Sequence, residues 1–451
     1  MILMKFRETV ESPCGLRHCL DSMELSCGLS HKTLLEKEMM TDAKSIQSAL
    51  DTLRMYAGLV ESDRRLVENV QFKLCGLREI GGTLTSLKEG RSLDDIELFE
   101  IKHLAMLGSE VRGELSSLPL PELDIDYDKI IDVLDPDGLR IGTFYIYDTY
   151  SPQLREARER LESDPGNEQL KEDVMSIEDD IRQNLSSMLR PWEESLRRVM
   201  NALADIDINI AKALLMKKEG YVIPRIGTCC RMEGMFHPEV KAMLESRARE
   251  FQRINFEYAS GSTATVIGAN MGGKTVALKT LCLAQYLFQF GFAVPAEKAE
   301  MEVFESIQFC IGDAQSEKKG LSSFAAEMLR INNVIMTSSR GVKTLALIDE
   351  PARTTNPVEG SALVSALLKI LGGRENLALV LTTHYKVDYA GQCWRVKGLV
   401  GGSAAQKMDY ELVKTDSSDV PHEALNIARE LHVSDLWINE ASMLLDGKER
   451  I

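Results

Sequence analysis

The stretch Gly268-Ala269-Asn270-Met271-Gly272-Gly273-Lys274-Thr275 has the pattern G-x-x-x-x-G-K-[ST]. Before it, Ala264 to Ile267 is an apolar, strand-like run, and after it, Val276 to Phe288 has the composition of a helix. A strand, this loop and a helix in that order predict a phosphate-binding loop rather than an ordinary glycine-rich turn. Its glycines let backbone N–H groups close around an anion at a helix N-terminus. We therefore expect Lys274 to reach the β- and γ-phosphates of a nucleotide and Thr275 to hold Mg²⁺.

Two further apolar segments end in residues that suit chemistry on a bound phosphate. The run from Thr344 to Ile348 is followed by the carboxylates Asp349 and Glu350. In a phosphate-loop ATPase the first acid orders Mg²⁺ and the second positions or activates water. The run from Leu377 to Thr383 is followed by His384, for which the pattern favours a γ-phosphate sensor over a purely structural histidine.

Length and composition describe an ordinary soluble protein of two to four domains. The 451 residues are 44% hydrophobic and 27% charged. We find no run of 18 apolar residues and no signal peptide, and so expect a cytoplasmic protein without a membrane partner. The nine cysteines are odd in number and scattered, which favours reduced thiols. The spacing of three of them and two nearby histidines departs from that of zinc sites, and we interpret these as core or incidental residues: Cys14, His18, Cys19, Cys27 and His31.

The net charge of −16 is unevenly distributed. Residues 1–215 hold 26 Lys and Arg against 41 Asp and Glu, whereas residues 216–451 hold 27 against 28. Proteins that bind polyanions usually present a basic face. The acidic half therefore argues against nucleic acid as its partner.

The pattern along the chain predicts four regions. Residues 1–120 have the composition of a helical core or lever region, and a Pro- and Asp-rich passage from Leu118 to Asp137 marks its end. Residues 121–215 predict a helical, coiled-coil-like arm in which Phe144 to Tyr147 forms a short strand. Apolar residues at three- and four-residue steps indicate the packed face of this arm: Leu170, Val174, Ile177, Ile181, Leu185, Met188, Trp192, Leu196, Val199, Leu203, Ile206, Ile210 and Ala213. Residues 216–415 alternate strands and helices, which predicts an α/β domain with a largely parallel sheet, and residues 416–451 predict two closing helices.

The phosphate loop resembles the G-P-N-M-G-G-K-[ST] loop of the MutS ATPase family. Other segments follow in that family's order and at its spacing: Val294-Pro295-Ala296, Gly320 to Met328, Asp349-Glu350 and Thr383-His384-Tyr385. Two more, Ile311 to Ser316 and Asn356 to Gly360, are closer to the MutS2 branch. The resemblance is strong over residues 203–445, where it includes Leu203 to Asp207, Gly234 to Pro238 and a closing helix-turn-helix from Ala424 to Leu445.

The resemblance implies an ABC-type P-loop ATPase that hydrolyses ATP with Mg²⁺ as a homodimer topped by helical levers. It implies Gly268, Asn270, Gly272, Gly273, Lys274 and Thr275 as nucleotide-binding residues and Thr275 and Asp349 as Mg²⁺ ligands. Glu350 would act on water, His384 would sense the γ-phosphate, and Ser322 would be offered to the nucleotide of the other subunit. The chain departs from the family at Ala269, which replaces a proline, and at Ala352 and Thr354, which replace glycines. We also do not recognise the mismatch-reading domain or the small nuclease domain.

Three functions remain open at this point. A DNA clamp related to mismatch repair or recombination follows from the family, and a local basic patch at Arg190, Arg197 and Arg198 could serve it. The acidic half of the chain fits the alternative of an ATP-driven protein remodeller, such as the reactivase of a cobalamin-dependent aminomutase. A nucleotide-dependent scaffold with little turnover would follow if the altered residues 352–354 impair closure. We rank the DNA clamp first because of the resemblance to the MutS family.

Overall fold

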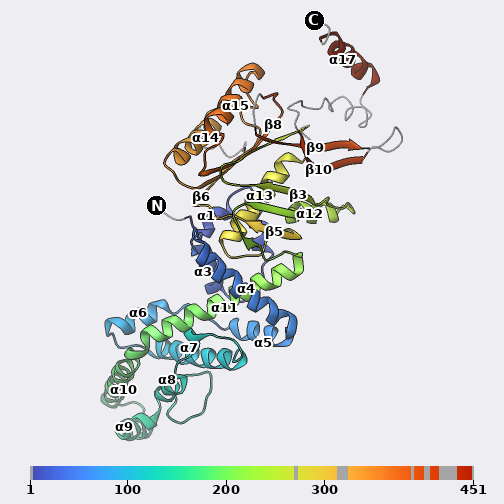
Figure 1. The fold of residues 1–451 in the computed structure, drawn as a ribbon. Coiled ribbons are helices and arrows are strands. Elements are labelled where there is room, and N and C mark those ends of the chain that lie inside the picture. The colour runs from blue at the N-terminus through green and yellow to red at the C-terminus, as the bar shows by residue number, and fades with distance from the viewer. Residues whose placement is uncertain are drawn as a thin grey trace. The chain divides into compact units, whose positions relative to one another are not determined.

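The computed structural model describes residues 4–268, 273–311, 323–387, 391–400, 407–415 and 434–448 (Figure 1). The chain forms two compact units, and both are discontinuous in sequence. Unit 1 consists of Met1–Ser22, Glu38–Arg54 and Leu215–Ile451, and unit 2 consists of Met23–Lys37 and Met55–Leu214. The four regions expected from the sequence follow chain order, so they did not anticipate that two N-terminal segments join the unit that carries the phosphate loop.

Unit 1 contains mixed sheets with helices packed on them. Its larger sheet has the strand order β10-β9-β4-β8-β7-β6, in which the neighbours from β9 to β6 run parallel and β10 runs antiparallel to β9. These strands are β4 (Thr263–Ile267), β6 (Ser306–Cys310), β7 (Thr344–Ile348), β8 (Leu377–Thr383), β9 (Gln392–Val400) and β10 (Lys407–Thr415). Every residue of β4, β7 and β8 is buried, which explains why these strands are continuous apolar runs.

Helices cover both faces of this sheet. Side chains of α14 (Ser323–Ser339) and α15 (Pro357–Leu371) form one hydrophobic cluster with Ala346 and Ile348 of β7 and Leu379 and Leu381 of β8. The helix α13 (Lys274–Gln289), which directly follows the phosphate loop, lies on the opposite face (Figure 1). Almost all of its residues from Ala277 to Gln289 are buried, as expected for a helix that is enclosed on all sides.

The N-terminal segments of unit 1 pack against the end of α13. Phe6 contacts Phe290 and Phe292, with ring centroids 4.9 and 5.9 Å apart. Met40 exchanges hydrogen bonds with Gln289 at 3.0 and 2.8 Å. The segments contain α1 (Phe6–Val10), α2 (Leu16–Asp21) and the first part of α4 (Ala43–Ser62). They therefore complete the core around the helix that begins at the phosphate loop.

A second, four-stranded sheet of unit 1 has the order β1-β5-β2-β3. Its strands are β1 (Arg225–Ile226), β2 (Cys230–Met235), β3 (Ile254–Tyr258) and β5 (Lys298–Met301), and α12 (Pro238–Glu245) follows β2. Near the C-terminus, α17 (Asp435–Lys448) is the second of the two closing helices that we expected. The first falls in residues 416–433, which lie outside the described part of the chain.

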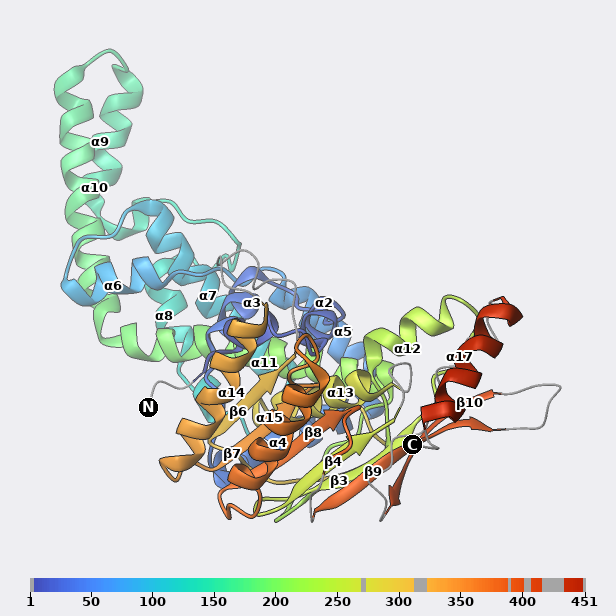
Figure 2. The same cartoon turned by 90° about the horizontal axis from the view of Figure 1, so that it is seen from above.

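Unit 2 is described throughout and contains helices but no strand. Its elements, some of which extend across the unit boundary, are α3 (Gly28–Glu36), α4, α5 (Arg64–Leu74), α6 (Gly81–Glu89), α7 (Asp95–Glu114), α8 (Tyr127–Leu134), α9 (Pro152–Ser163), α10 (Glu168–Leu189) and α11 (Glu193–Glu219). Three short 3₁₀ turns join them: Pro121–Leu123, Asp148–Tyr150 and Arg190–Trp192. The views from two directions show α9 and α10 side by side as a helical hairpin (Figure 2).

The predicted short strand at residues 144–147 is wrong. No strand of unit 2 is available to pair with this segment, and it is held by side-chain contacts instead. Tyr147 is buried, and the Lys102 ammonium lies 5.9 Å from the centre of its ring. The same ammonium donates to the backbone oxygen of Thr143 at 3.0 Å. A short run of aromatic and β-branched residues thus imitated a strand in the sequence.

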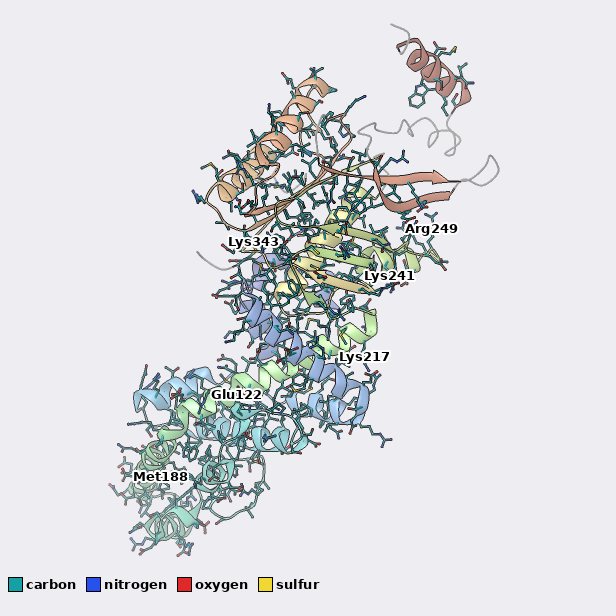
Figure 3. All side chains as sticks on the ribbon, viewed as in Figure 1. Glu122, Met188, Lys217, Lys241, Arg249 and Lys343 are labelled. Atoms are coloured by element: carbon teal, nitrogen blue, oxygen red, sulfur yellow. The ribbon has the colours of Figure 1, made fainter. Side chains whose placement is uncertain are left out.

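The apolar stripe of α10 and α11 is buried except at four positions, since Leu170, Ile177 and Trp192 are partly exposed and Met188 is exposed. Val174, Ile181 and Leu185 are buried on α10, and all the predicted positions from Leu196 to Ala213 on α11 are buried. Met188 is 57% exposed, and Figure 3 shows it at the surface of the unit. Leu189, one residue later, is fully buried in its place, because α10 ends there and the chain turns through Pro191.

None of the helices formed by the described residues is long and apolar enough to span a membrane. Among the same residues, no group of three or more His, Cys, Asp and Glu side chains could hold a metal ion. This holds also for the cysteines and histidines near the N-terminus.

Candidate nucleotide-binding site

The phosphate loop begins and ends in backbone conformations that favour glycine. Gly268 directly follows β4 and has φ 147°, and a Cβ there would lie 3.4 Å from the side chain of Val396. Gly273 has φ 75° and caps the N-terminus of α13. Side chains are strained at such φ values. Residues 269–272, and with them the predicted Asn270 and Gly272, lie outside the described residues.

Lys274 is buried at the first position of α13, with only 3% of its surface exposed. Its ammonium donates to the backbone oxygen of Gly268 at 2.6 Å and lies 3.1 Å from Oε1 of Glu350. A buried charge requires such partners. The lysine therefore points along the loop toward the carboxylates at the end of β7.

The carboxylate of Asp349 links the start of α13 to the end of β8. Thr275 donates its hydroxyl to Oδ2 of Asp349 at 2.8 Å, and Thr382 donates to Oδ1 of the same carboxylate at 2.7 Å. Asp349 follows β7 and Thr382 lies at the end of β8, and parallel neighbours bring their carboxyl ends to one edge of a sheet. A hydroxyl beside a carboxylate offers the oxygen ligands that Mg²⁺ prefers, so this pair fits the metal.

Glu350 lies among cationic and potentially cationic groups. Besides Lys274, Nη1 of Arg353 lies 3.5 Å and Nδ1 of His384 4.0 Å from its Oε2. The residue has φ 41°, and its backbone N–H donates to the Thr382 hydroxyl at 2.9 Å. A carboxylate held in an uncommon backbone conformation by a specific hydrogen bond is a feature that clusters at functional sites.

His384 carries a buried ring nitrogen without a hydrogen bond. Among the described residues, Nδ1 has no hydrogen-bond partner. Burial, together with the charges of Lys274 and Arg353, lowers the pKa of the imidazole below 6.5, although the Glu350 carboxylate opposes this shift. The ring is therefore neutral at pH 7. A neutral imidazole with an unsatisfied buried nitrogen is suited to receive a polar group of a ligand.

Sequence analysis missed three residues of this site. Thr382 holds Asp349, and the polar pair Thr382-Thr383 at the end of an apolar strand was a signal for it. Arg353 gave no signal beyond its closeness in sequence to Glu350. Tyr410 of β10 is 40% exposed, and a Cβ on Gly273 would lie 3.2 Å from its ring. Only the hairpin of β9 and β10 brings this ring to the loop, so no local pattern could reveal it.

The altered loop after the acidic pair adopts a conformation that glycine would favour. Ala352 has φ 62°, is buried, and accepts a hydrogen bond of 2.9 Å from the hydroxyl of Tyr385. Its backbone also bonds the carboxylate of Glu327 on α14, although burial raises the pKa of that carboxyl. The left-handed turn is thus retained without the glycine, at the cost of strain. Ser322, which precedes α14, lies outside the described residues.

The comparisons with known proteins place this site in a recognised domain. Residues 264–392, which extend from β4 to the start of β9, match the family MutS domain V. This part of the chain is similar to MutS domain V, a P-loop ATPase-type domain, and it contains Lys274, Thr275, Asp349, Glu350 and His384.

Similarity to individual proteins extends beyond the MutS domain V. Over 443 residues the chain is 25% identical to an endonuclease MutS2 of Streptococcus thermophilus, which covers 91% of this chain and 54% of that protein. An endonuclease MutS2 of Streptococcus gordonii is 32% identical over 209 residues, or 46% of this chain and 26% of the relative. The DNA mismatch repair protein MutS of Thermus thermophilus is 32% identical over 208 residues, or 46% and 24%. The chain thus spans about half or less of the length of these relatives.

Proposed function

We propose that this protein is a MutS-like ATPase that binds ATP with Mg²⁺ at the edge of the larger sheet and hydrolyses it. The observation that carries this proposal is the convergence of one lysine, two hydroxyls, two carboxylates and one histidine at the ends of β4, β7 and β8. These are the residue types that phosphoryl transfer to water requires.

Each side chain has a role that follows from its place. Lys274 gives its charge to the phosphates, and Thr275 and Asp349 hold the metal. Mg²⁺ would supply neutralisation of the phosphate charge when the nucleotide is bound. Glu350 orients and deprotonates the attacking water, since its carboxylate lies beside the lysine that marks the phosphate position. His384, neutral at pH 7, uses its free Nδ1 to recognise the terminal phosphate.

Tyr410 adds a proposed contact to the other end of the nucleotide. Its ring lies next to Gly273, at the C-terminal side of the phosphate loop. An exposed aromatic face at this position can stack on a base. This contact would contribute affinity for ATP without taking part in the chemistry.

The test of the ATPase site compares two glutamate variants. In Glu350→Gln the protein should still bind a fluorescent ATP analogue, while steady-state hydrolysis falls about 100-fold, because the water loses its base. Glu359→Gln is the matched control, since Glu359 is an exposed residue in the first turn of α15. Equal hydrolysis by the two variants would remove Glu350 from the mechanism.

We further propose that the ATPase acts on DNA as a homodimeric clamp. The support is the family itself and a relative named for DNA mismatch repair. Unit 2 does not favour contacts with phosphates, because it holds 21 Lys and Arg against 35 Asp and Glu. The patch considered from the sequence is also partly neutralised, since Arg197 pairs with Glu193 at 2.7 Å. We therefore assign the DNA contacts of the clamp to unit 1, whose net charge is −2.

Binding to duplex, branched and single-stranded DNA tests this assignment. Affinity measured by fluorescence anisotropy with ATP present should fall steeply with salt, because each neutralised phosphate releases counterions. No binding even at low salt would exclude the clamp while leaving the ATPase proposal intact.

A mixing experiment tests the shared site of the proposed dimer. If Ser322 of one subunit completes the site of the other, Lys274→Ala and Ser322→Ala homodimers should both be nearly inactive. Co-expressed heterodimers should recover activity, because one site then pairs intact Lys274 with intact Ser322. If Ser322 only caps its own helix, its removal costs about 1 kcal/mol of stability and leaves turnover unchanged.

A further inference from the structure

Unit 2 carries a groove of about 810 Å³ between α5 and α7, two helices that lie side by side (Figure 1). Phe72 and Lys73 line it from α5, and His103, Met106 and Leu107 line it from α7. The groove lies within unit 2, whereas the residues of the nucleotide site belong to unit 1. It has the size of a ligand-binding cleft, for which the ATPase proposal provides no role.

One large aromatic side chain at this groove is exposed to solvent. Phe72 is 81% exposed, although α5 has buried positions at Val67, Val70 and Leu74 where an apolar side chain finds the core. Met106 on the facing helix is partly exposed as well. Aromatic and methionine side chains are enriched in protein–protein interfaces, because removing their apolar surface from water stabilises the complex.

The charges at the groove select against an anionic occupant. The Lys73 ammonium lies 2.6 Å from Oε2 of Glu110, so its charge is compensated. The pKa of His103 is lowered by burial and by the charge of Arg78, which keeps this imidazole neutral at pH 7. Glu114 adds a further carboxylate to the lining. Unit 2 as a whole has a net charge of −14.

We propose that this groove docks an amphipathic helix of a protein partner that carries Lys or Arg beside large apolar side chains. The apolar face of such a helix would cover Phe72 and Met106, and its cations would approach Glu110 and Glu114. Grooves between two helices recognise partner helices in this way, through apolar anchors spaced three and four residues apart. Single-stranded nucleic acid also uses aromatic platforms, but it requires cations that this groove does not offer.

Synthetic probes test this proposal on the full chain. The first probe is a fluorescein-labelled peptide of about 18 residues composed of Leu and Lys, with Leu at positions i, i+3, i+4 and i+7. The second replaces every Lys with Glu, and the third is a labelled single-stranded oligonucleotide. We expect the Leu/Lys peptide to bind and the other two to remain unbound. Bound peptide should slow amide hydrogen exchange in residues 64–76 and 103–114.

Matched variants distinguish the groove from general attraction to an acidic protein. Phe72→Ala should weaken the Leu/Lys peptide about tenfold, as for an interface anchor, whereas Met175→Ala, at a side chain 63% exposed on α10, should not change it. Glu114→Lys should weaken binding more than Glu172→Lys, which changes the net charge equally at an exposed site on α10. Binding that is equal in all four variants, or stronger binding of the oligonucleotide, would refute the proposal. ATP hydrolysis by the same variants should be normal, which separates this test from that of the ATPase.

Discussion

Lys274 of unit 1 and Lys102 of unit 2 are both buried lysines that pair with a carboxylate, but their surroundings differ. The Lys274 ammonium lies 3.1 Å from Glu350, and the Lys102 ammonium lies 3.6 Å from Asp135. The Asp135 carboxylate also accepts from the backbone N–H groups of Leu139 and Arg140, and Arg140 has a positive φ of 50°. Around Glu350 the backbone has positive φ values, and a ring nitrogen of His384 remains without a hydrogen bond among the described residues.

The Lys102 pair closes a loop onto α7, where the buried hydroxyl of Tyr147 also lacks a hydrogen bond among the described residues. The Lys274 pair brings together groups that a phosphate and a metal can satisfy better than the protein does alone. Burial, an ion pair, a positive φ and an unsatisfied polar atom occur at both lysines and are therefore weak indicators of a site by themselves. A lysine that directly follows a phosphate loop and faces carboxylates at the ends of parallel strands is a stronger one.

The largest expected effect is on the stability of unit 2. Lys102→Met should lower the free energy of unfolding by about 3–5 kcal/mol, because Asp135 is left as an uncompensated buried charge. Lys129→Met is the control: Lys129 is an exposed lysine whose partner is Asp126 at 2.8 Å, and its loss should cost less than about 1 kcal/mol. Urea unfolding monitored by circular dichroism measures both. Similar values for the two variants would show that another group compensates the charge of Asp135.

The second effect is on catalysis. Lys274→Met should reduce ATP hydrolysis about 100- to 1,000-fold, as removal of a preorganised cationic donor does. Its unfolding free energy should change less than that of Lys102→Met, because Arg353 and His384 remain beside Glu350. Lys369→Met, at an exposed position of α15, is the control. The contrast fails if Lys102→Met lowers turnover per folded molecule as much as Lys274→Met does.

The third effect is a loss of stability of unit 1 at acid pH, caused by the buried, neutral imidazole of His237. Burial lowers the pKa of His237 to about 4, and its Nε2 lies 3.1 Å from the backbone oxygen of Cys14. Between pH 6.5 and about 4 the unfolded chain therefore binds a proton that the folded chain does not. Stability should be complete above pH 6.5 and should fall by about 3 kcal/mol as the pH drops to 4.

Unfolding at a series of pH values checks this response. His237→Gln removes the titrating group, so its unfolding free energy should depend less on pH between 6.5 and 4. His31→Gln is the control because His31 is an exposed histidine. If wild type and His237→Gln lose stability in parallel, the acid response arises from other groups.

The smallest effect concerns the strained turn beside the acidic pair. Ala352→Gly should raise the unfolding free energy by a few tenths to about 1 kcal/mol, because relief of left-handed strain exceeds the entropy cost of glycine. Ala362→Gly, at an exposed helical position of α15, should instead lower it by about 1 kcal/mol. Thermal unfolding of both variants measures the sign. Destabilisation by Ala352→Gly would mean that the turn is not strained.

The sequence revealed those parts of the site that lie in one contiguous stretch or at the end of an apolar run. Lys274, Thr275, Asp349, Glu350 and His384 all have this property, so the pattern identified them and the structure brings them together. The roles of Ser322, Asn270 and Gly272, which lie outside the described residues, stay predictions.

Features that depend on contacts across the chain could not be predicted in this way. Tyr410 reaches the loop through strand pairing, and Lys102 appears in the sequence as an ordinary charged residue within a helix. The apolar run at residues 144–147 was mistaken for a strand because aromatic and β-branched side chains can be buried by tertiary contacts without a hydrogen-bonded neighbouring strand. Tertiary contacts, rather than local propensity, determine all three.

The packing of Phe6 on Phe290 and Phe292 has a consequence for synthesis on the ribosome. These partners are separated by up to 286 residues, and at 5–20 residues per second the N-terminal segment waits roughly 15–60 seconds for the surface that buries it. Residues 23–37 and 55–214, by contrast, are complete well before α13 begins at Lys274. Unit 2 can therefore fold while the first helix of the nascent chain still exposes its phenylalanine, which makes that segment the part of the chain that a chaperone would encounter first.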